Sequence, residues 1–237
     1  MAVSGQIDAG RHKHWLFQLF ISSQEPLNIV VDGQRLNCHA LLVNMDTVHQ
    51  CHAEKDVYLT MLIDPTTTLG RNLRCFLQDQ SFYAFPANQA IQLQQALQHA
   101  IKQEDQEAIF RFYQTIPFPC AALPELDVRI ISVLGLLDTC FHDEEHHQVE
   151  YLAKAVHLSK SRLAHLFKNE IGVPLKSYIV LHKLQTAYDI IFQGATITEA
   201  ALQVGFDSPS HLAYTNKLMT GMSSTDIRKD SEFLKVI

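Results

Sequence analysis

The last third of the chain contains two similar segments, and this repetition restricts the fold more than any other feature of the sequence. Ala153, Val156 and Leu158 recur 48 residues later as Ala201, Val204 and Phe206. After a shift of one residue, Ser161, Leu163, Ala164, Lys168 and Gly172 recur 49 residues later as Ser210, Leu212, Ala213, Lys217 and Gly221. Two copies of one spacing indicate two copies of one structural unit.

Each copy has the pattern of a helix, a tight turn and a second helix. A small alanine in the first helix allows another helix to cross closely, and Gly205 suits a turn that requires a positive φ. Ser159 predicts an N-cap in the first copy, and Ser208 before Pro209 predicts one in the second. The sequence therefore predicts two helix-turn-helix units.

The second helix of each copy is expected to be amphipathic. Leu163, Leu166 and Phe167 form its predicted buried stripe in the first copy. The remaining side chains are small or polar and suit base edges and phosphates. They are Lys160, Ser161, Arg162, His165 and Asn169 in the first copy, and Ser210, His211, Tyr214 and Thr215 in the second.

One uninterrupted helical pattern, from Pro174 to Phe192, separates the copies. Its 19 residues, at about 1.5 Å each, span about 28 Å. That length is close to the roughly 34 Å between successive major-groove faces of B-DNA. A single chain could therefore address two adjacent grooves of double-stranded DNA.

From about Leu126 to Lys229, the sequence resembles the DNA-binding domain of AraC/XylS-type transcriptional regulators. The resemblance is carried by the run YLAKAVHLSKSRLAHLFKNEIGVPLKSYIVLHKLQTAYDII and, after it, by ITEAALQVGFDSPSHLAYTNKLMTG. It implies that the helices beginning near Ser159 and Ser208 enter the major groove, and that RNA polymerase is a partner. The implied base contacts are Ser161, Arg162, His165, Ser210, His211 and Tyr214, and the implied phosphate contacts are Lys168 and Lys217.

The second copy departs from the pattern of this family at two positions. Asn216 stands where the family usually has an aromatic residue, and Ser224 stands in place of the usual proline. A buried amide costs about 1–3 kcal/mol when it is unpaired. We therefore expect the second unit to be looser or to contribute less to specificity.

The composition is that of an ordinary soluble chain. It has 237 residues, 47% hydrophobic and 19% charged, which predicts two domains. The sequence shows neither a bilayer-spanning apolar run nor a secretory signal, so we expect a cytoplasmic protein without membrane contact. Five cysteines without a close pair indicate reduced thiols. The net charge of −6 does not by itself indicate nucleic-acid binding.

The N-terminal part predicts strands between about His14 and Phe85. Short apolar runs separated by turn residues predict a small β-barrel or jelly roll. The runs are Leu16 to Ile21, Leu27 to Val31, Ala40 to Val43 and Val57 to Ile63. The barrel resembles a cupin, a fold that the same regulator family often uses as a sensor.

A helical connector is expected after the strands, because the residues from Asn88 to Tyr113 are rich in Ala, Gln, Leu and Glu. Its apolar side is a candidate surface for a homodimer, and packing on its own barrel is the alternative. That side consists of Ile91, Leu97, Ile101, Ile109 and Phe112. The predicted class is α+β, with a cupin-like sensor over 1–86, the connector over 87–125 and the DNA-binding domain over 126–237.

Histidines near the N-terminus form a candidate effector or metal site. His12 and His14 alternate, so they would lie on one side of a strand, with Gln18 close by and His49 completing the set. Three neutral imidazoles suit Zn, Fe, Ni or Cu. A metal-binding cupin usually has Glu where Gln18 stands. We therefore predict no resident cofactor and favour an effector pocket or a structural remnant over a metal site.

The sequence predicts a sequence-specific transcription regulator, controlled by a small-molecule effector in the N-terminal barrel, and not an enzyme. The motifs of serine hydrolysis and of nucleotide hydrolysis are missing from the sequence. Two alternatives remain open. One is a metal-dependent cupin enzyme, and the other is an adaptor that uses the helices to bind protein without DNA specificity.

Overall fold

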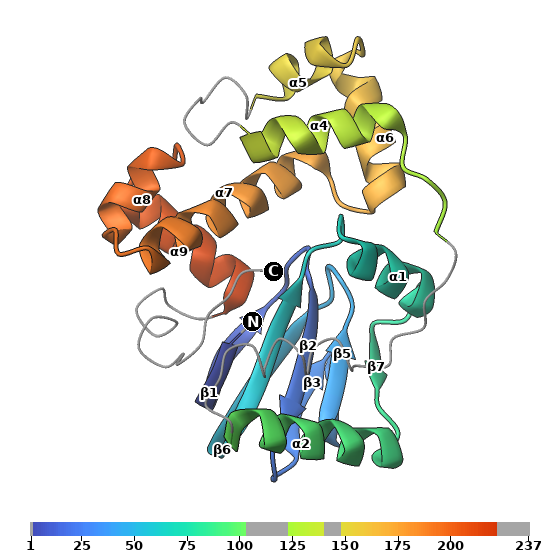
Figure 1. The fold of residues 1–237 in the computed structure, drawn as a ribbon, viewed down its shortest axis with the longest axis vertical. Coiled ribbons are helices and arrows are strands. Elements are labelled where there is room, and N and C mark those ends of the chain that lie inside the picture. The colour runs from blue at the N-terminus through green and yellow to red at the C-terminus, as the bar shows by residue number, and fades with distance from the viewer. Residues whose placement is uncertain (1, 103–122, 140–147, 222–237) are drawn as a thin grey trace. The chain divides into compact units, whose positions relative to one another are not determined.

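Figure 1 shows a computed structural model of the protein, which describes residues 2–102, 123–139 and 148–221. The chain divides into two compact units, and the first stretch of the N-terminal unit ends at Ala121. The N-terminal unit is an antiparallel sheet with helices and the C-terminal one is helical, which confirms the predicted α+β class. Among the described residues, no helix has both the length and the apolar character needed for a bilayer span.

The N-terminal unit is built on a seven-stranded sheet in which every observed pairing is antiparallel. The strand order is β4-β3-β6-β2-β5-β7, and β1 pairs with β6. The strands are β1 (Ala2–His12), β2 (Phe17–Ser22), β3 (Leu27–Val31), β4 (Gln34–Cys38), β5 (Ala40–Val43), β6 (His49–Ile63) and β7 (Phe82–Ala84).

Strand β2 is buried on both faces, which explains its continuous apolar run. Phe17, Leu19 and Ile21 belong to one hydrophobic core, and Phe20 belongs to a second core on the other face. All four predicted strands are confirmed, although β6 begins at His49 and is therefore longer than expected. Strand β6 pairs with β1, β2 and β3, so it ties the sheet together.

The expectation of strands alone up to Phe85 is wrong, because helix α1 (Thr68–Leu77) interrupts the region. The hydroxyl of Thr67 accepts a hydrogen bond from the amide of Gly70 at 3.0 Å and caps this helix. Leu73 and Leu77 of α1 pack into the same core as β2. The capping residue Thr67 was the signal for a helix start.

Helix α2 (Ala87–Lys102) packs on the sheet of its own unit. The contacting side chains are spaced for one helical face, and they are Ala90, Leu93, Leu97 and Ala100. Of the side chains predicted for a dimer surface, Leu97 is in this core, whereas Ile91 is 50% exposed. Ile109 and Phe112 lie outside the described residues, and so does the side chain of Ile101.

The C-terminal unit consists of helices whose apolar faces meet. Leu152, Leu163, Phe167 and Leu212 are almost fully buried, together with Ala200 and Ala201. The linking helix runs as predicted within one residue. The helices are α4 (Val128–Thr139), α5 (Val149–Ala155), α6 (Lys160–Ile171), α7 (Leu175–Phe192), α8 (Ile197–Gln203) and the first part of α9 (Pro209–Thr220), up to Thr215.

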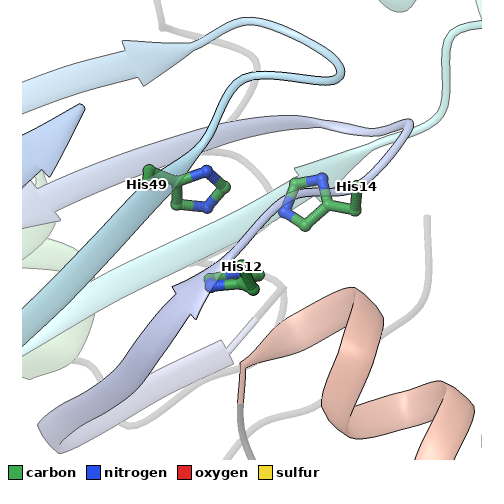
Figure 2. Close-up of side chains that lie close together, drawn as sticks. All are labelled: His12, His14 and His49. Carbon is green, nitrogen blue, oxygen red and sulfur yellow. The ribbon is translucent and has the colours of Figure 1, made fainter. Parts of the chain in front are cut away.

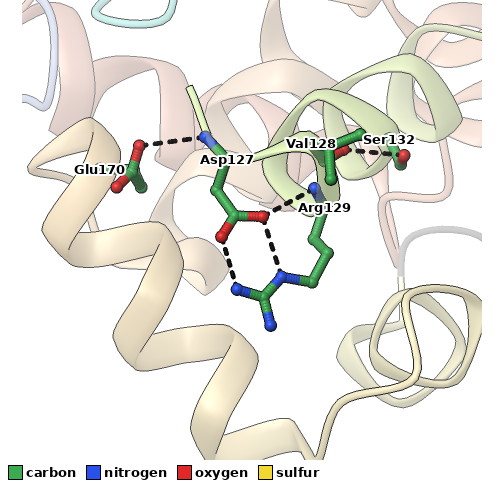
Figure 3. Close-up of polar contacts among 5 residues, drawn as sticks. All are labelled: Asp127, Val128, Arg129, Ser132 and Glu170. Carbon is green, nitrogen blue, oxygen red and sulfur yellow. Dashed lines mark hydrogen bonds and ion pairs between the residues drawn. The ribbon is translucent and has the colours of Figure 1, made fainter. Parts of the chain in front are cut away.

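The start of α4 is fixed to α6 by polar contacts (Figure 3). The Asp127 amide donates to Glu170 Oε2 at 3.3 Å, and the Arg129 amide donates to Asp127 Oδ1 at 2.9 Å. The Arg129 guanidinium also binds the Asp127 carboxylate, and its hydrogen bonds lower the pKa of Asp127 to about 2. These contacts hold the beginning of α4 against the first helix-turn-helix unit.

Candidate DNA interface and a buried histidine cluster

The two copies have the same turn down to individual hydrogen bonds. In the first copy, the amides of Val156, His157 and Leu158 donate to the carbonyls of Leu152, Lys154 and Ala153 at 3.3, 3.1 and 2.9 Å. In the second copy, those of Val204, Gly205 and Phe206 donate to Ala200, Leu202 and Ala201 at 3.1, 3.3 and 2.9 Å. The predicted repeat is therefore a structural repeat.

The turn residue has a left-handed backbone in both copies, with φ of 54° at His157 and 73° at Gly205. Such a φ is easy for glycine and costs energy for a residue with a Cβ. The sequence predicted this turn only for Gly205. The offset of 48 residues that aligns His157 with Gly205 was the signal for the other copy.

Matching caps begin the second helix of each copy. Ser159 Oγ accepts from the Arg162 amide at 3.3 Å, and Ser208 Oγ accepts from the His211 amide at 3.1 Å. Both predicted N-caps are therefore present. Helix α6 ends at Gly172, which has a left-handed φ of 88°.

The eight DNA contacts that the family resemblance implies are all exposed, and so is Lys160 of the outward-facing set. On α6 they are Lys160, Ser161, Arg162, His165 and Lys168, and on α9 they are Ser210, His211, Tyr214 and Lys217. Four pairs occupy equivalent positions, and they are Ser161 with Ser210, Arg162 with His211, His165 with Tyr214, and Lys168 with Lys217. Each set runs along one face of its helix, opposite the buried leucine.

Two details of the predicted buried and exposed faces differ from the structure. Thr215, expected to face outward, is 6% exposed and therefore buried. Thr215 aligns with Leu166 of the predicted buried stripe, so the repeat already indicated that Thr215 faces inward. Leu166 itself is half-buried. Asn216 is fully buried, as predicted for the position equivalent to Phe167, and its side chain is not left without a partner. Ser224 lies outside the described residues.

Acidic and polar neighbours hold several of the exposed side chains. Lys160 Nζ lies 3.4 Å from Glu150 Oε2, and His211 Nδ1 lies 2.9 Å from Asp207 Oδ2. His165 Nδ1 lies 3.0 Å from the side-chain amide of Asn169. Exposed ion pairs are weak, at about 0–1 kcal/mol, so DNA can replace them.

The second turn is also attached to the linking helix. Lys183 Nζ on α7 donates to the carbonyl of Gly205 at 3.0 Å. His182, on the same helix, lies with Nε2 3.3 Å from Asp138 Oδ1 of α4. Polar contacts thus connect α7 both to the second turn and to α4.

The predicted N-terminal site is also assembled, as a cluster of buried imidazoles (Figure 2). His12, His14 and His49 are 7%, 3% and 1% exposed, and candidate ligand atoms from all three lie within 4.8 Å of one another. Gln18 belongs to the cluster, because its Oε1 is 2.9 Å from His14 Nε2 and 2.8 Å from His49 Nε2.

The predicted reason for this proximity is wrong in one respect. His12 is the last residue of β1, whereas His14 lies in the connection to β2, so the two do not share one strand. His12 is opposite His49 in the pairing of β1 with β6, and this register brings their rings to a centroid distance of 4.2 Å. Pairing between strands therefore assembles the cluster.

Burial keeps these imidazoles neutral at pH 7. Desolvation lowers the pKa of His14 to about 4 and that of His49 to about 3, and it also lowers the pKa of His12. A neutral imidazole has one nitrogen with a free lone pair and can bind a metal ion. The cluster could therefore hold a cation.

Comparison with known proteins agrees with the fold and with the repeat. Residues 152–230 match the family model of a helix-turn-helix domain. No curated protein sequence matches the chain. Crystal structures of ToxT from Vibrio cholerae have a similar fold. An apo variant has a TM-score of 0.60 at 10% identity, covering 94% of this chain and 92% of that one. Wild-type ToxT with bound unsaturated fatty acid has a TM-score of 0.58 at 12% identity, covering 100% and 96%.

The fold and the exposed residues define a protein with a double helix-turn-helix domain, the class of domain that presents a second helix to the major groove of DNA. Residues 152–230 are an AraC-type helix-turn-helix domain, as the sequence resemblance implied.

Proposed function

We propose that this protein is a sequence-specific DNA-binding transcription regulator controlled by a small-molecule effector. The observation that carries the proposal is the matched exposure of four residue pairs on two helices with identical turns and caps. A bundle that served only to pack would have no reason to keep equivalent polar residues at equivalent exposed positions.

Some of the exposed side chains suit contacts with bases, and others suit contacts with phosphates. Arg162 has the donor geometry for a guanine edge, while His165 and the serines can donate to or accept from bases. Lys168 and Lys217, in the second half of their helices, suit phosphate. Lys160 would first leave Glu150, its partner at 3.4 Å.

The effector and the protein partners are further parts of the proposal. The N-terminal sheet is the proposed sensor, and the bound fatty acid in a ToxT structure of similar fold supports control by a small molecule. An effector would act by binding one conformation of the chain better than another, which shifts the population of DNA-competent molecules. Homodimerisation and contact with RNA polymerase are the corresponding expectations for partners.

The test begins by selecting binding sites from a random DNA library with the purified full-length protein. Arg162→Ala should then weaken binding to the selected site about 5- to 150-fold, which corresponds to about 1–3 kcal/mol. It should weaken binding to scrambled DNA much less. Arg35→Ala is the matched control, because Arg35 is an exposed arginine on β4, outside the helix-turn-helix domain.

Three outcomes would contradict the proposal. Enrichment of no motif would favour a protein-binding adaptor. Equal losses on selected and scrambled DNA would show that Arg162 does not read bases. Turnover of a substrate that requires bound metal, without DNA selectivity, would favour a cupin enzyme.

A further inference from the structure

The histidine cluster has a pattern of hydrogen bonds that a structural remnant does not require. Each ring places Nδ1 next to a backbone carbonyl, at 2.7 Å from Gly10 O for His12, 3.0 Å from Leu16 O for His14 and 2.8 Å from Thr47 O for His49. At His14 the Leu16 amide also donates to Nδ1, at 3.3 Å, so the proton of this ring can be on Nδ1, toward the carbonyl, or on Nε2, toward Gln18. His12 and His49, whose Nδ1 atoms face only a carbonyl, are therefore Nδ1–H tautomers.

This tautomer leaves a lone pair without a proton on Nε2 of His12 and of His49. The lone pair of His49 faces Gln18 Oε1 at 2.8 Å, so two acceptors meet without a hydrogen between them, and His14 Nε2 lies 2.9 Å from the same oxygen. Among the described residues, His12 Nε2 is buried and has no hydrogen-bond partner. An electron-rich cluster of this kind needs a positive centre or a donor.

Two arrangements could supply one. A half-turn of the Gln18 amide would let its NH2 group donate to His14 and His49, but it leaves the buried His12 Nε2 unsatisfied. A metal ion at the centre would satisfy all three Nε2 atoms and the Gln18 oxygen together. The orphaned nitrogen of His12 therefore favours the ion.

We propose that His12, His14 and His49 bind one divalent transition-metal ion through their Nε2 atoms, with the side-chain oxygen of Gln18 as the fourth ligand. The ion belongs to the Zn, Ni, Co or Cu group, because imidazole nitrogen suits these metals, whereas Mg and Ca take oxygen ligands.

The ring spacing agrees with such a site. A metal–nitrogen bond of about 2.0 Å and a ring radius of about 1.2 Å place each centroid about 3.2 Å from the ion, and thus centroids about 5.2 Å apart in a tetrahedron. The observed centroid distances are 4.2, 5.1 and 5.5 Å. The carbonyls at Nδ1 are the outer contacts that orient metal-binding histidines.

The experiment uses full-length protein without a histidine tag, stripped of metal with a chelator. Calorimetric titration with Zn²⁺ should give one site per chain, and Co²⁺ should give the d–d absorption of a nitrogen-coordinated ion. His12→Gln should weaken Zn²⁺ binding at least tenfold. This variant removes no observed contact with Gln18, so it should remain folded, which circular dichroism will verify.

Two further variants make the result decisive. His52→Gln is the matched control, because His52 is exposed on β6 beside Asp8 and Glu54, at 3.2 and 3.5 Å, and any loose binding of Zn²⁺ there would disappear in it. Gln18→Glu replaces a neutral ligand by a charged one, and should tighten Zn²⁺ binding at least tenfold.

The proposal is overturned if wild-type protein shows no one-to-one binding, or if His12→Gln binds Zn²⁺ as tightly as wild type. It is also overturned if His52→Gln, and not His12→Gln, abolishes binding. Since no DNA is present in these titrations, their failure leaves the proposed DNA binding untouched.

Discussion

Replacing the first turn residue by glycine should stabilise the C-terminal unit. His157 has a φ of 54° and is exposed, whereas the equivalent residue in the second copy is already glycine, Gly205, with a φ of 73°. A side chain in this conformation costs about 1–2 kcal/mol. Glycine removes that cost, but its freedom in the unfolded chain offsets about 0.4–1 kcal/mol. The expected net gain for His157→Gly is therefore about 0.5–1 kcal/mol.

The control separates the backbone effect from the loss of the imidazole. His157→Ala keeps a Cβ at the same φ, so its free energy of unfolding should stay within about 0.5 kcal/mol of wild type. The reciprocal change, Gly205→Ala, should destabilise by about 1 kcal/mol. In that variant, the contact from Lys183 to the backbone carbonyl of residue 205 can persist.

The measurement is urea unfolding followed by far-UV circular dichroism, together with hydrogen exchange of peptides that cover 149–171 and 197–220. Hydrogen exchange assigns the change to the correct turn, because a two-unit chain need not unfold in one step. If His157→Gly and His157→Ala shift stability equally, or if Gly205→Ala is neutral, the two turns do not share a strained backbone and the argument for matched units fails.

Three more outcomes are expected. Lys168→Ala should weaken binding to selected and to scrambled DNA equally, and should reduce the slope of log K against log salt by about 0.9. Arg162→Ala, which removes a base contact, should leave this slope nearly unchanged. Binding titrations at several salt concentrations check both expectations. Asp56→Asn should cost about 1.5–3 kcal/mol above pH 5, because the carboxylate accepts from Ser23 and from backbone amides. Burial opposes these bonds, yet they lower the pKa of Asp56, so its contribution is lost as the pH falls below about 4, and urea midpoints across pH should converge there. Gly70→Ala should destabilise by several kcal/mol in thermal unfolding, because a Cβ would lie 2.0 Å from the carbonyl oxygen of Asp64.

The sequence predicted the helix-turn-helix units well because their determinants are local. Caps such as Ser159 and Ser208 act within three residues, and the buried stripe follows helical spacing. Duplication then allowed each copy to check the other. Thr215 was wrongly expected to face outward because this comparison was not made: its aligned partner, Leu166, was already placed in the buried stripe.

The N-terminal unit was harder to predict because its determinants are distant in sequence. The register that sets His12 opposite His49 depends on β1 pairing with β6 across an interval that contains four other whole strands. Helix α1 was missed because its apolar spacing stands among strand-like runs, and its cap at Thr67 resembles an ordinary turn. The composition of the cluster was visible, but its hydrogen bonding to three carbonyls was not.

The exposed stripes of α6 and α9 have a consequence for how such a protein can diverge. Their polar side chains lie outside the packed interior, so exchanging one for another changes the free energy of unfolding by only about 0.5 kcal/mol. Each copy also closes its own turn and cap with its own atoms. Natural selection could therefore change the DNA sequence that one copy prefers, while the other copy continues to bind its half of the ancestral operator.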